Sequence, residues 1–82
     1  MTSQKGNTQP KYIQIYHWFQ EQLKNGSFSI GDQIPTETAL ARQLGVTRMT
    51  VRKALNRLVV EGIITRTRGK GSFVAAENHK NF

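Results

Sequence analysis

The chain has 82 residues, a formal net charge of +7 and no cysteine. This length suits a single domain, and the lack of cysteine excludes disulfide bridges and thiolate metal sites. No apolar run approaches the ~20 residues of a membrane-spanning helix, and the polar N-terminus lacks the apolar region of a signal peptide, so we expect a cytoplasmic protein.

The positive charge is concentrated in one part of the chain. Glu61 is the only acid between residues 42 and 70, a segment that also holds most of the basic side chains. A polyanionic partner explains this distribution, although a basic surface that only maintains solubility is the alternative. An anionic membrane is disfavoured because no helix pairs the basic face with a bulky exposed apolar one. The basic residues are Arg42, Arg48, Arg52, Lys53, Arg57, Arg66, Arg68 and Lys70.

The N-terminal part is predicted to be a polar, disordered arm over residues 1–9, followed by a helix. The helix is expected to have Pro10 in its first turn, where a missing N–H costs nothing, and to stop near Asn25-Gly26. One face is marked at helical spacing by Tyr12, Ile15, Phe19 and Leu23. Three further apolar side chains lie partly off this stripe, at Ile13, Tyr16 and Trp18. We favour a wide core-facing surface over a contact with another subunit.

Residues 27–35 are predicted to form a connector with a turn at Gly31-Asp32. Its apolar side chains are expected to pack inward: Phe28, Ile30 and Ile34. A second helix then starts at Glu37, because Thr36 suits the N-cap position and the carboxylate of Glu37 suits the positive end of the helix dipole.

Residues 37–56 have the pattern of two short helices joined by a tight turn. The small side chain of Ala41 leaves room for a crossing helix, and Gly45 stands where a helix end needs a left-handed residue. Thr47 stands at the N-cap of the next helix. This spacing predicts a helix-turn-helix, whose second helix can enter a DNA major groove. The alternative is an ordinary helical hairpin with a solvated basic face.

The second helix of this pair is expected to end at Glu61-Gly62 and to bury one apolar stripe: Val51, Ala54, Leu55 and Leu58. After it, the alternating residues 63–75 predict a β-hairpin with a glycine-bearing basic tip at residues 69–71. We expect Arg66 and Arg68 to alternate with inward-facing strand side chains. A small hairpin after a helix-turn-helix is a wing. Residues 76–82 are expected to be a linker or a truncated end.

The chain carries, in order, PKYIQI, NGSFSIGDQIPTE, LARQLGVTRMTVRKALNRLVVEGII and RGKGSFV. This series resembles the N-terminal winged-helix domain of GntR-family bacterial transcription regulators over roughly residues 10–75. The combination of GVTRMTVRKAL with GKGSFV is most similar to the HutC branch. The resemblance implies an α+β fold: a three-helix winged helix-turn-helix with a C-terminal β-hairpin wing.

The resemblance also implies partners. The full-length protein is expected to be a homodimer on a near-palindromic DNA operator, and usually a repressor. In the HutC branch a C-terminal effector domain senses a small metabolite and holds the dimer. The 82 residues contain no such domain, so we expect an excised DNA-binding domain that is monomeric or weakly self-associating.

Arg48 is our first candidate for reading a base. It begins the recognition helix, and its guanidinium matches the O6 and N7 acceptors of guanine. The arginine of G-V-[ST]-R commonly reads bases in this family, although a phosphate clamp is the alternative. Arg52 lies one turn on and suits either role, of which we favour the phosphate contact. Thr47 and Thr50 suit a phosphate or a thymine methyl group, and Lys53 and Asn56 can reach the groove edge.

The remaining candidates lie at the start of the earlier helix and in the wing. Thr36 and Thr38 open a helix whose unpaired N–H groups form a phosphate seat, and Glu37 is expected to orient an arginine. The family commonly has an arginine where this chain has Thr38, so its usual base preference does not carry over directly. The wing residues expected at DNA are Arg66, Arg68, Gly69, Lys70 and Gly71.

Two other classes of function remain as alternatives. An enzyme is disfavoured because His17 and His79 have no partner at catalytic or metal-ligand spacing, and we expect neither a cofactor nor a bound metal. A winged helix that binds RNA, protein or DNA without sequence preference is disfavoured by the donors concentrated at one helix start.

Overall fold

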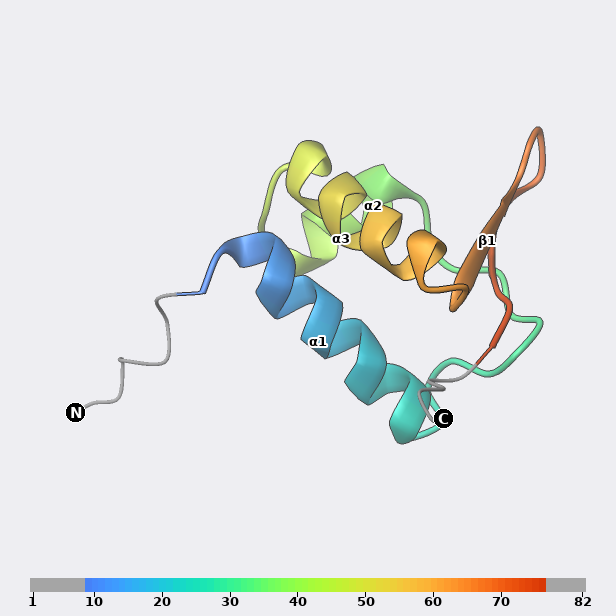
Figure 1. The fold of residues 1–82 in the computed structure, drawn as a ribbon. Coiled ribbons are helices and arrows are strands. Elements are labelled where there is room, and N and C mark those ends of the chain that lie inside the picture. Colours follow the sequence, from blue (N-terminus) through green and yellow to red (C-terminus); the bar gives the residue numbers. More distant parts are fainter. Residues whose placement is uncertain (1–8, 77–82) are drawn as a thin grey trace.

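The computed structural model describes residues 9–76, so residues 1–8 of the arm predicted over 1–9 and residues 77–82 of the end predicted over 76–82 lie outside the described residues. Three helices are followed by an antiparallel hairpin: α1 (Lys11–Lys24), α2 (Glu37–Leu44), α3 (Arg48–Val60), β1 (Ile64–Thr67) and β2 (Gly71–Val74). α1 lies along one side of the α2–α3 pair, and the hairpin extends beyond the end of α3 (Figure 1). The predicted three helices and C-terminal wing are confirmed.

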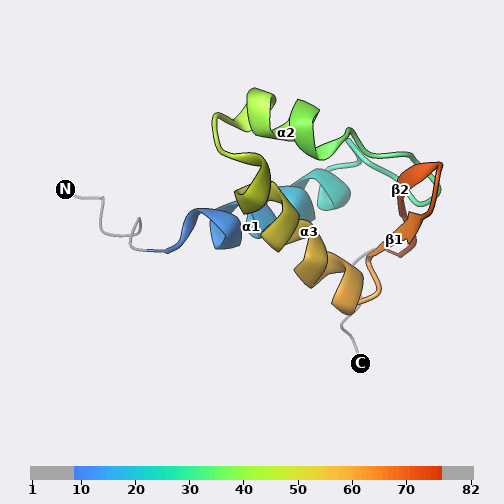
Figure 2. The ribbon, with the colours of Figure 1, turned by 90° about the horizontal axis from the view of Figure 1, so that it is seen from above.

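The core is built around α3, which packs on α1, α2 and β1. Seen from above, α3 crosses over α1, with α2 to one side and the hairpin beyond its end (Figure 2). The predicted apolar stripe of α3 is buried, and it meets Phe19 of α1 and Leu40 of α2, both fully buried. Each such side chain contributes about 1.5–3 kcal/mol to folding through the apolar surface it removes from water.

α1 begins one residue later than the sequence pattern predicts. Pro10 is the N-cap, and its carbonyl accepts hydrogen bonds from the backbone N–H groups of Ile13 and Gln14. The wide core-facing surface is confirmed, because Tyr16 is only 7% exposed and belongs to the core. Trp18 is half-buried and meets the ring of Phe28 edge-on.

The connector contradicts one prediction, because Ile30 is 59% exposed instead of buried. The cause is a tight turn closed by the Asp32 N–H, which donates to the Ser29 carbonyl, with Gly31 in a left-handed conformation. After the turn the connector runs beside β2. The backbone of Ile34 bonds to that of Ser72, so the connector stabilises the wing from outside.

The side chains of β1 do not alternate as predicted. Ile64 is buried opposite Val74, whereas Thr65 and Thr67 are exposed. Arg66 therefore shares the face of Ile64, and its guanidinium reaches residues of α2 and α3. The prediction failed because both Ile63 and Ile64 are buried where the chain leaves α3. The rest of the four-residue strand projects past the core.

Candidate nucleic-acid interface

The turn between α2 and α3 fixes where the recognition helix starts. Gly45 ends α2 in a left-handed conformation with φ of 72°, and Thr47 caps α3. The Thr47 side chain accepts a hydrogen bond from the Thr50 N–H at 3.2 Å, and the two hydroxyls are 2.9 Å apart. Both sequence predictions for this turn are confirmed, and the two threonines act as a structural cap.

Arg48 follows this cap as the first residue of α3. Its side chain is exposed, and no other residue within 9–76 forms an ion pair or side-chain hydrogen bond with its guanidinium. An exposed guanidinium at a helix start retains all its donors for an external acceptor. The structure therefore places this candidate where a base or a phosphate could be contacted.

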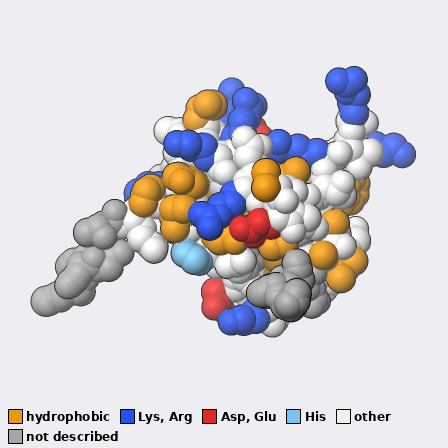
Figure 3. All heavy atoms as spheres, viewed as in Figure 1, with side chains coloured by type: hydrophobic (Ala, Val, Ile, Leu, Met, Phe, Trp, Pro, Cys, Tyr) orange, Lys and Arg blue, Asp and Glu red, His pale blue; other side chains and the backbone are white. Residues whose placement is uncertain are grey.

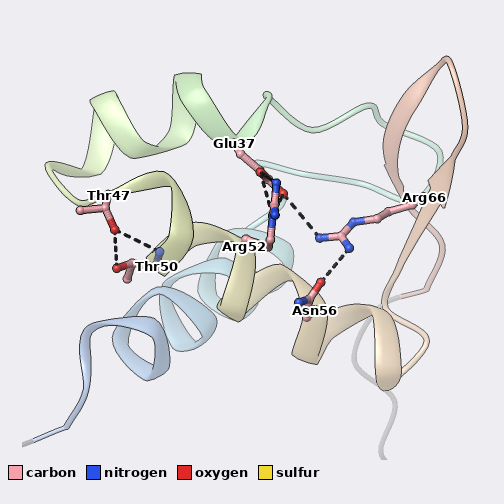
Figure 4. A network of polar contacts seen from close by, with 6 residues as sticks. All are labelled: Glu37, Thr47, Thr50, Arg52, Asn56 and Arg66. Atoms are coloured by element: carbon pink, nitrogen blue, oxygen red, sulfur yellow. Dashed lines mark hydrogen bonds and ion pairs between the residues drawn. The ribbon is translucent and has the colours of Figure 1, made fainter.

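Glu37 joins three elements of the fold. Its carboxylate accepts hydrogen bonds from Arg52 of α3, with Nε 3.3 Å from each oxygen and Nη2 at 3.2 Å from Oε1. Arg66 of β1 adds an ion pair to the other oxygen at 3.7 Å. Arg66 also donates from Nη1 to Oδ1 of Asn56 at 2.7 Å, and Figure 4 shows the four side chains converging from α2, α3 and the hairpin.

This network agrees with the prediction that Glu37 orients an arginine, and it adds a second arginine from the wing. The side chains remain partly exposed, so water screens the pairs and their contribution to stability is small. Their main effect is geometric. Two cations from different elements are held side by side, at the junction between the recognition helix and the wing.

Lys53 follows Arg52 on the exposed face of α3 but contacts a different element. Its Nζ stands 4.8 Å from the ring centre of Tyr12, in a cation–π contact with the first turn of α1. Such a contact at an exposed site is worth about 0.5–1 kcal/mol. The contact fixes Lys53 beside the start of α1, on the exposed face of α3.

The wing tip is held by a residue that the sequence did not single out. Nε2 of Gln33 donates to the Lys70 carbonyl at 2.8 Å, across 37 positions of the chain. Gly71 has φ of 119°, and a Cβ added there would lie 2.5 Å from the same Gln33 nitrogen. Gly71 therefore serves the packing of the tip. Arg68, Gly69 and Lys70 are all exposed at this tip.

The start of α2 opens onto the same side as the wing. Thr36 is the N-cap and its hydroxyl accepts from the Ala39 N–H at 3.0 Å, while Thr38 is exposed in the first turn. Thr36, Thr38 and Gly71 line one hollow between α2 and β2. Figure 3 shows Lys and Arg side chains gathered along the upper side of this view, over the helices and the hairpin. Lys and Arg side chains of the helices and the hairpin thus share one cationic face.

Metal and membrane features are limited to what residues 9–76 show. No group of three or more His, Cys, Asp or Glu side chains in this part of the chain is arranged to hold a metal ion. None of the described helices has the length and apolar character needed to cross a membrane.

Residues 11–74 match the family model of the bacterial regulatory proteins of the gntR family. The chain belongs to the GntR family. The HTH-type transcriptional repressor NagR of Bacillus subtilis is 41% identical over 75 residues, which cover 92% of this chain and 31% of NagR. The histidine utilization repressor of Pseudomonas putida is 36% identical over 66 residues, or 80% of this chain and 27% of that protein. The GntR chain thus spans about a third or less of these curated relatives.

Among solved structures, the DNA-binding domain of AraR in complex with operator ORX1 superposes with a TM-score of 0.80. The two are 35% identical, and the match covers 92% of this chain and 90% of that domain. A GntR-family regulator from Listeria monocytogenes gives a TM-score of 0.81 at 29% identity, covering 84% of this chain and 60% of the other. The predicted family and winged-helix fold are therefore confirmed.

Proposed function

We propose that this GntR-family chain binds double-stranded DNA with sequence preference, with the first turns of α3 in the major groove and the wing at the adjacent minor groove. The observation that carries the proposal is the match to the AraR domain, which was solved on its operator. That match includes nearly the whole of both chains. Every element that forms the cationic face here thus has a counterpart in a domain that binds DNA.

Arg48 is the residue that reads a base. It begins the helix that enters the groove, where side chains reach base edges, and its guanidinium has no partner within residues 9–76. A guanidinium donates two parallel hydrogen bonds to O6 and N7 of guanine. Its removal should therefore cost discrimination at one base position rather than affinity for DNA in general.

The other candidates contact the DNA backbone. Glu37 holds the side chains of Arg52 and Arg66 beside each other. Two cations at a fixed distance from each other suit phosphates on the rim of the groove. The N–H groups at the start of α2 provide a further phosphate seat beside Thr36 and Thr38. The tip residues Arg68 and Lys70 bring charge to the minor groove, where Gly69 allows close approach of the backbone.

The longer protein is proposed to be a transcriptional repressor. Two such domains would occupy a near-palindromic operator as a homodimer, and a small-molecule effector would act through a further domain. The repressors among the relatives support this assignment. Each carries a segment similar to this chain, and each whole protein is at least three times as long as that matched segment. On its own, the 82-residue chain should bind one half-site as a monomer.

The deciding experiment is selection of bound duplexes from a random pool, followed by anisotropy titration of the selected and of a shuffled duplex at the same salt. Binding of the selected duplex at least tenfold more tightly than the shuffled one supports sequence preference. Specific sites usually exceed non-specific DNA in affinity by more than this factor. Equal affinity for the two duplexes would instead favour a winged helix that coats DNA without reading it.

Two substitutions separate the two kinds of contact. Arg48→Ala should cost about 1–3 kcal/mol on the selected duplex and relax the preference at one base position. Lys70→Ala, which removes an exposed cation from the wing, should weaken binding to selected and shuffled duplexes alike and flatten the salt dependence by about one unit of slope. If the two variants behave identically, Arg48 contacts a phosphate and the base-reading role is wrong.

A further inference from the structure

The exposed face of α3 has a centre line that is not purely polar. Exposed residues recur at helical spacing directly opposite the buried stripe, at Met49, Lys53, Asn56 and Val60. Met49 is 63% exposed, although it lies in the first turn between Arg48 and Arg52. The folded chain therefore leaves the apolar side chain of Met49 exposed to water. It does so in the first turn of α3, which under the proposed function enters the groove deepest.

A major groove offers one apolar group on the base edges, the C5-methyl of a pyrimidine. Thymine always carries this methyl, and cytosine carries it when methylated. An unbranched thioether adapts its shape to such a small group better than a branched side chain does. Removing both surfaces from water would favour the complex, whereas a polar base edge would leave Met49 without a matching partner.

We propose that Met49 reads a pyrimidine C5-methyl group opposite the first turn of α3, so that the recognised half-site contains a methyl-bearing base beside the position read by Arg48. The inference rests on the proposed function, because it places this turn in a major groove. It identifies Met49 as a specificity-determining residue that neither the charge pattern nor the cap residues indicate.

The two threonines near the turn are less suited to this contact. The hydroxyls of Thr47 and Thr50 are bonded to each other, and Thr47 also accepts from the Thr50 N–H. Thr50 is half-buried and lies about 100° around the helix from Met49. The sequence alone leaves Thr47 and Thr50 as candidates for a thymine methyl, whereas the geometry favours Met49.

The same face supplies a matched control. Val60 is 85% exposed on the same centre line, but it lies about 16 Å further along the helix axis. Both residues are solvent-exposed in the folded chain, so truncating either should leave the core intact. A general loss of apolar surface on α3 would affect the two variants equally, whereas a specific methyl contact concerns Met49 alone.

The test replaces each thymine of the selected half-site by uracil, which removes only the methyl group. One replacement should weaken binding of the unaltered chain about three- to fivefold, as expected for burying one methyl-sized group. Met49→Ala should lose about the same factor on the thymine duplex and should not respond to that replacement. Val60→Ala should respond as the unaltered chain does.

A second arm identifies the source of the methyl group. Each cytosine of the half-site is replaced by 5-methylcytosine. A three- to fivefold gain at one position that disappears in Met49→Ala would identify methylated cytosine as the base that is read, whereas a response only to uracil identifies thymine. Either result supports the proposal.

Three results would overturn it. Tight binding to the selected duplex with no response to any methyl removed or added would exclude the methyl contact and leave the proposed function intact. A response of the same size in Met49→Ala would assign the methyl contact to another residue. Equal binding to selected and shuffled duplexes would contradict the proposed function itself, and with it the inference.

Discussion

Glu37 holds two arginines that come from different elements, Arg52 of α3 and Arg66 of β1. Glu37→Gln keeps the size of the side chain and removes its charge. We expect tighter binding to shuffled duplexes and a salt dependence steeper by about one unit, because two cations are released and one repelling charge is lost. Preference for the selected duplex should fall, since the arginines are no longer held together.

The matched control is Glu21→Gln, which removes the same charge from an exposed position on α1. Anisotropy titrations across a salt series compare the two variants, and thermal unfolding checks the fold. The free energy of unfolding should change by less than about 1 kcal/mol, since the pairs of Glu37 are partly exposed. Equal effects of the two substitutions on DNA preference would show that Glu37 acts only through net charge.

Gly71 and Gln33 form a coupled pair at the wing. Gly71→Ala places a side chain at φ of 119° and displaces the Gln33 amide, so we expect a loss of about 1–3 kcal/mol in the free energy of unfolding. Gln33→Ala alone should cost about 0.5–1.5 kcal/mol, the value of its hydrogen bond to Lys70. In the Gly71→Ala background the second substitution should cost almost nothing.

Urea denaturation of the two single variants and the double variant measures this coupling. Gly69→Ala is the control, because Gly69 also has a positive φ but nothing lies within 4 Å of an added Cβ. Strictly additive losses for residues 33 and 71 would mean that the amide moves aside without losing its bond.

At the scale of elements, the helices could be predicted and the wing only in part. A helix can be predicted from the periodic spacing of apolar residues within one segment of the chain. The N-cap at Thr47 and the left-handed residue at Gly45 likewise depend only on their immediate neighbours. The face of Arg66 depends on how the hairpin meets the end of α3, and the exposure of Ile30 depends on the turn that the connector makes at Gly31. No local sequence pattern indicates how the hairpin meets α3, and none predicts the hydrogen bond between Gln33 and Lys70.

α1 and the end of α3 are joined by Tyr16, whose hydroxyl donates to the Glu61 carboxylate, while Arg57 lies over its ring. Burial, followed by the bond to Glu61 and the charge of Glu61, raises the pKa of Tyr16 above its ordinary value of 10.0. The folded state therefore keeps its proton where the unfolded chain has lost it. This contribution to stability is fully present below about pH 10 and is lost as the pH rises through the folded-state pKa.

Chemical denaturation between about pH 8 and about pH 11 tests this linkage. The unaltered chain should lose stability more steeply above about pH 10 than Tyr16→Phe does, because that variant lacks the titrating hydroxyl. Tyr12→Phe is the matched control on the same helix. Parallel curves for the unaltered chain and Tyr16→Phe would show that the Tyr16 proton is not linked to folding.

At the scale of the whole molecule, the net charge of +7 and the cationic face should dominate affinity. About five to seven phosphate contacts would give a slope of roughly −5 to −6 for the logarithm of affinity against that of salt concentration. Anisotropy titration between about 50 and about 300 mM salt measures this slope. A slope shallower than about −2 would mean that most of these cations do not contact phosphates.

The cation–π contact between Lys53 and Tyr12 has a practical corollary for these assays. It brings the first turn of α1 against the side of α3 that we propose faces the groove, whereas Ala76 is bonded to Ile63 just past the far end of that helix. A fluorophore attached ahead of Pro10 would therefore start next to the incoming duplex and interfere with the contact it reports. Tags and dyes belong behind Ala76, where the backbone departs from the other end of α3.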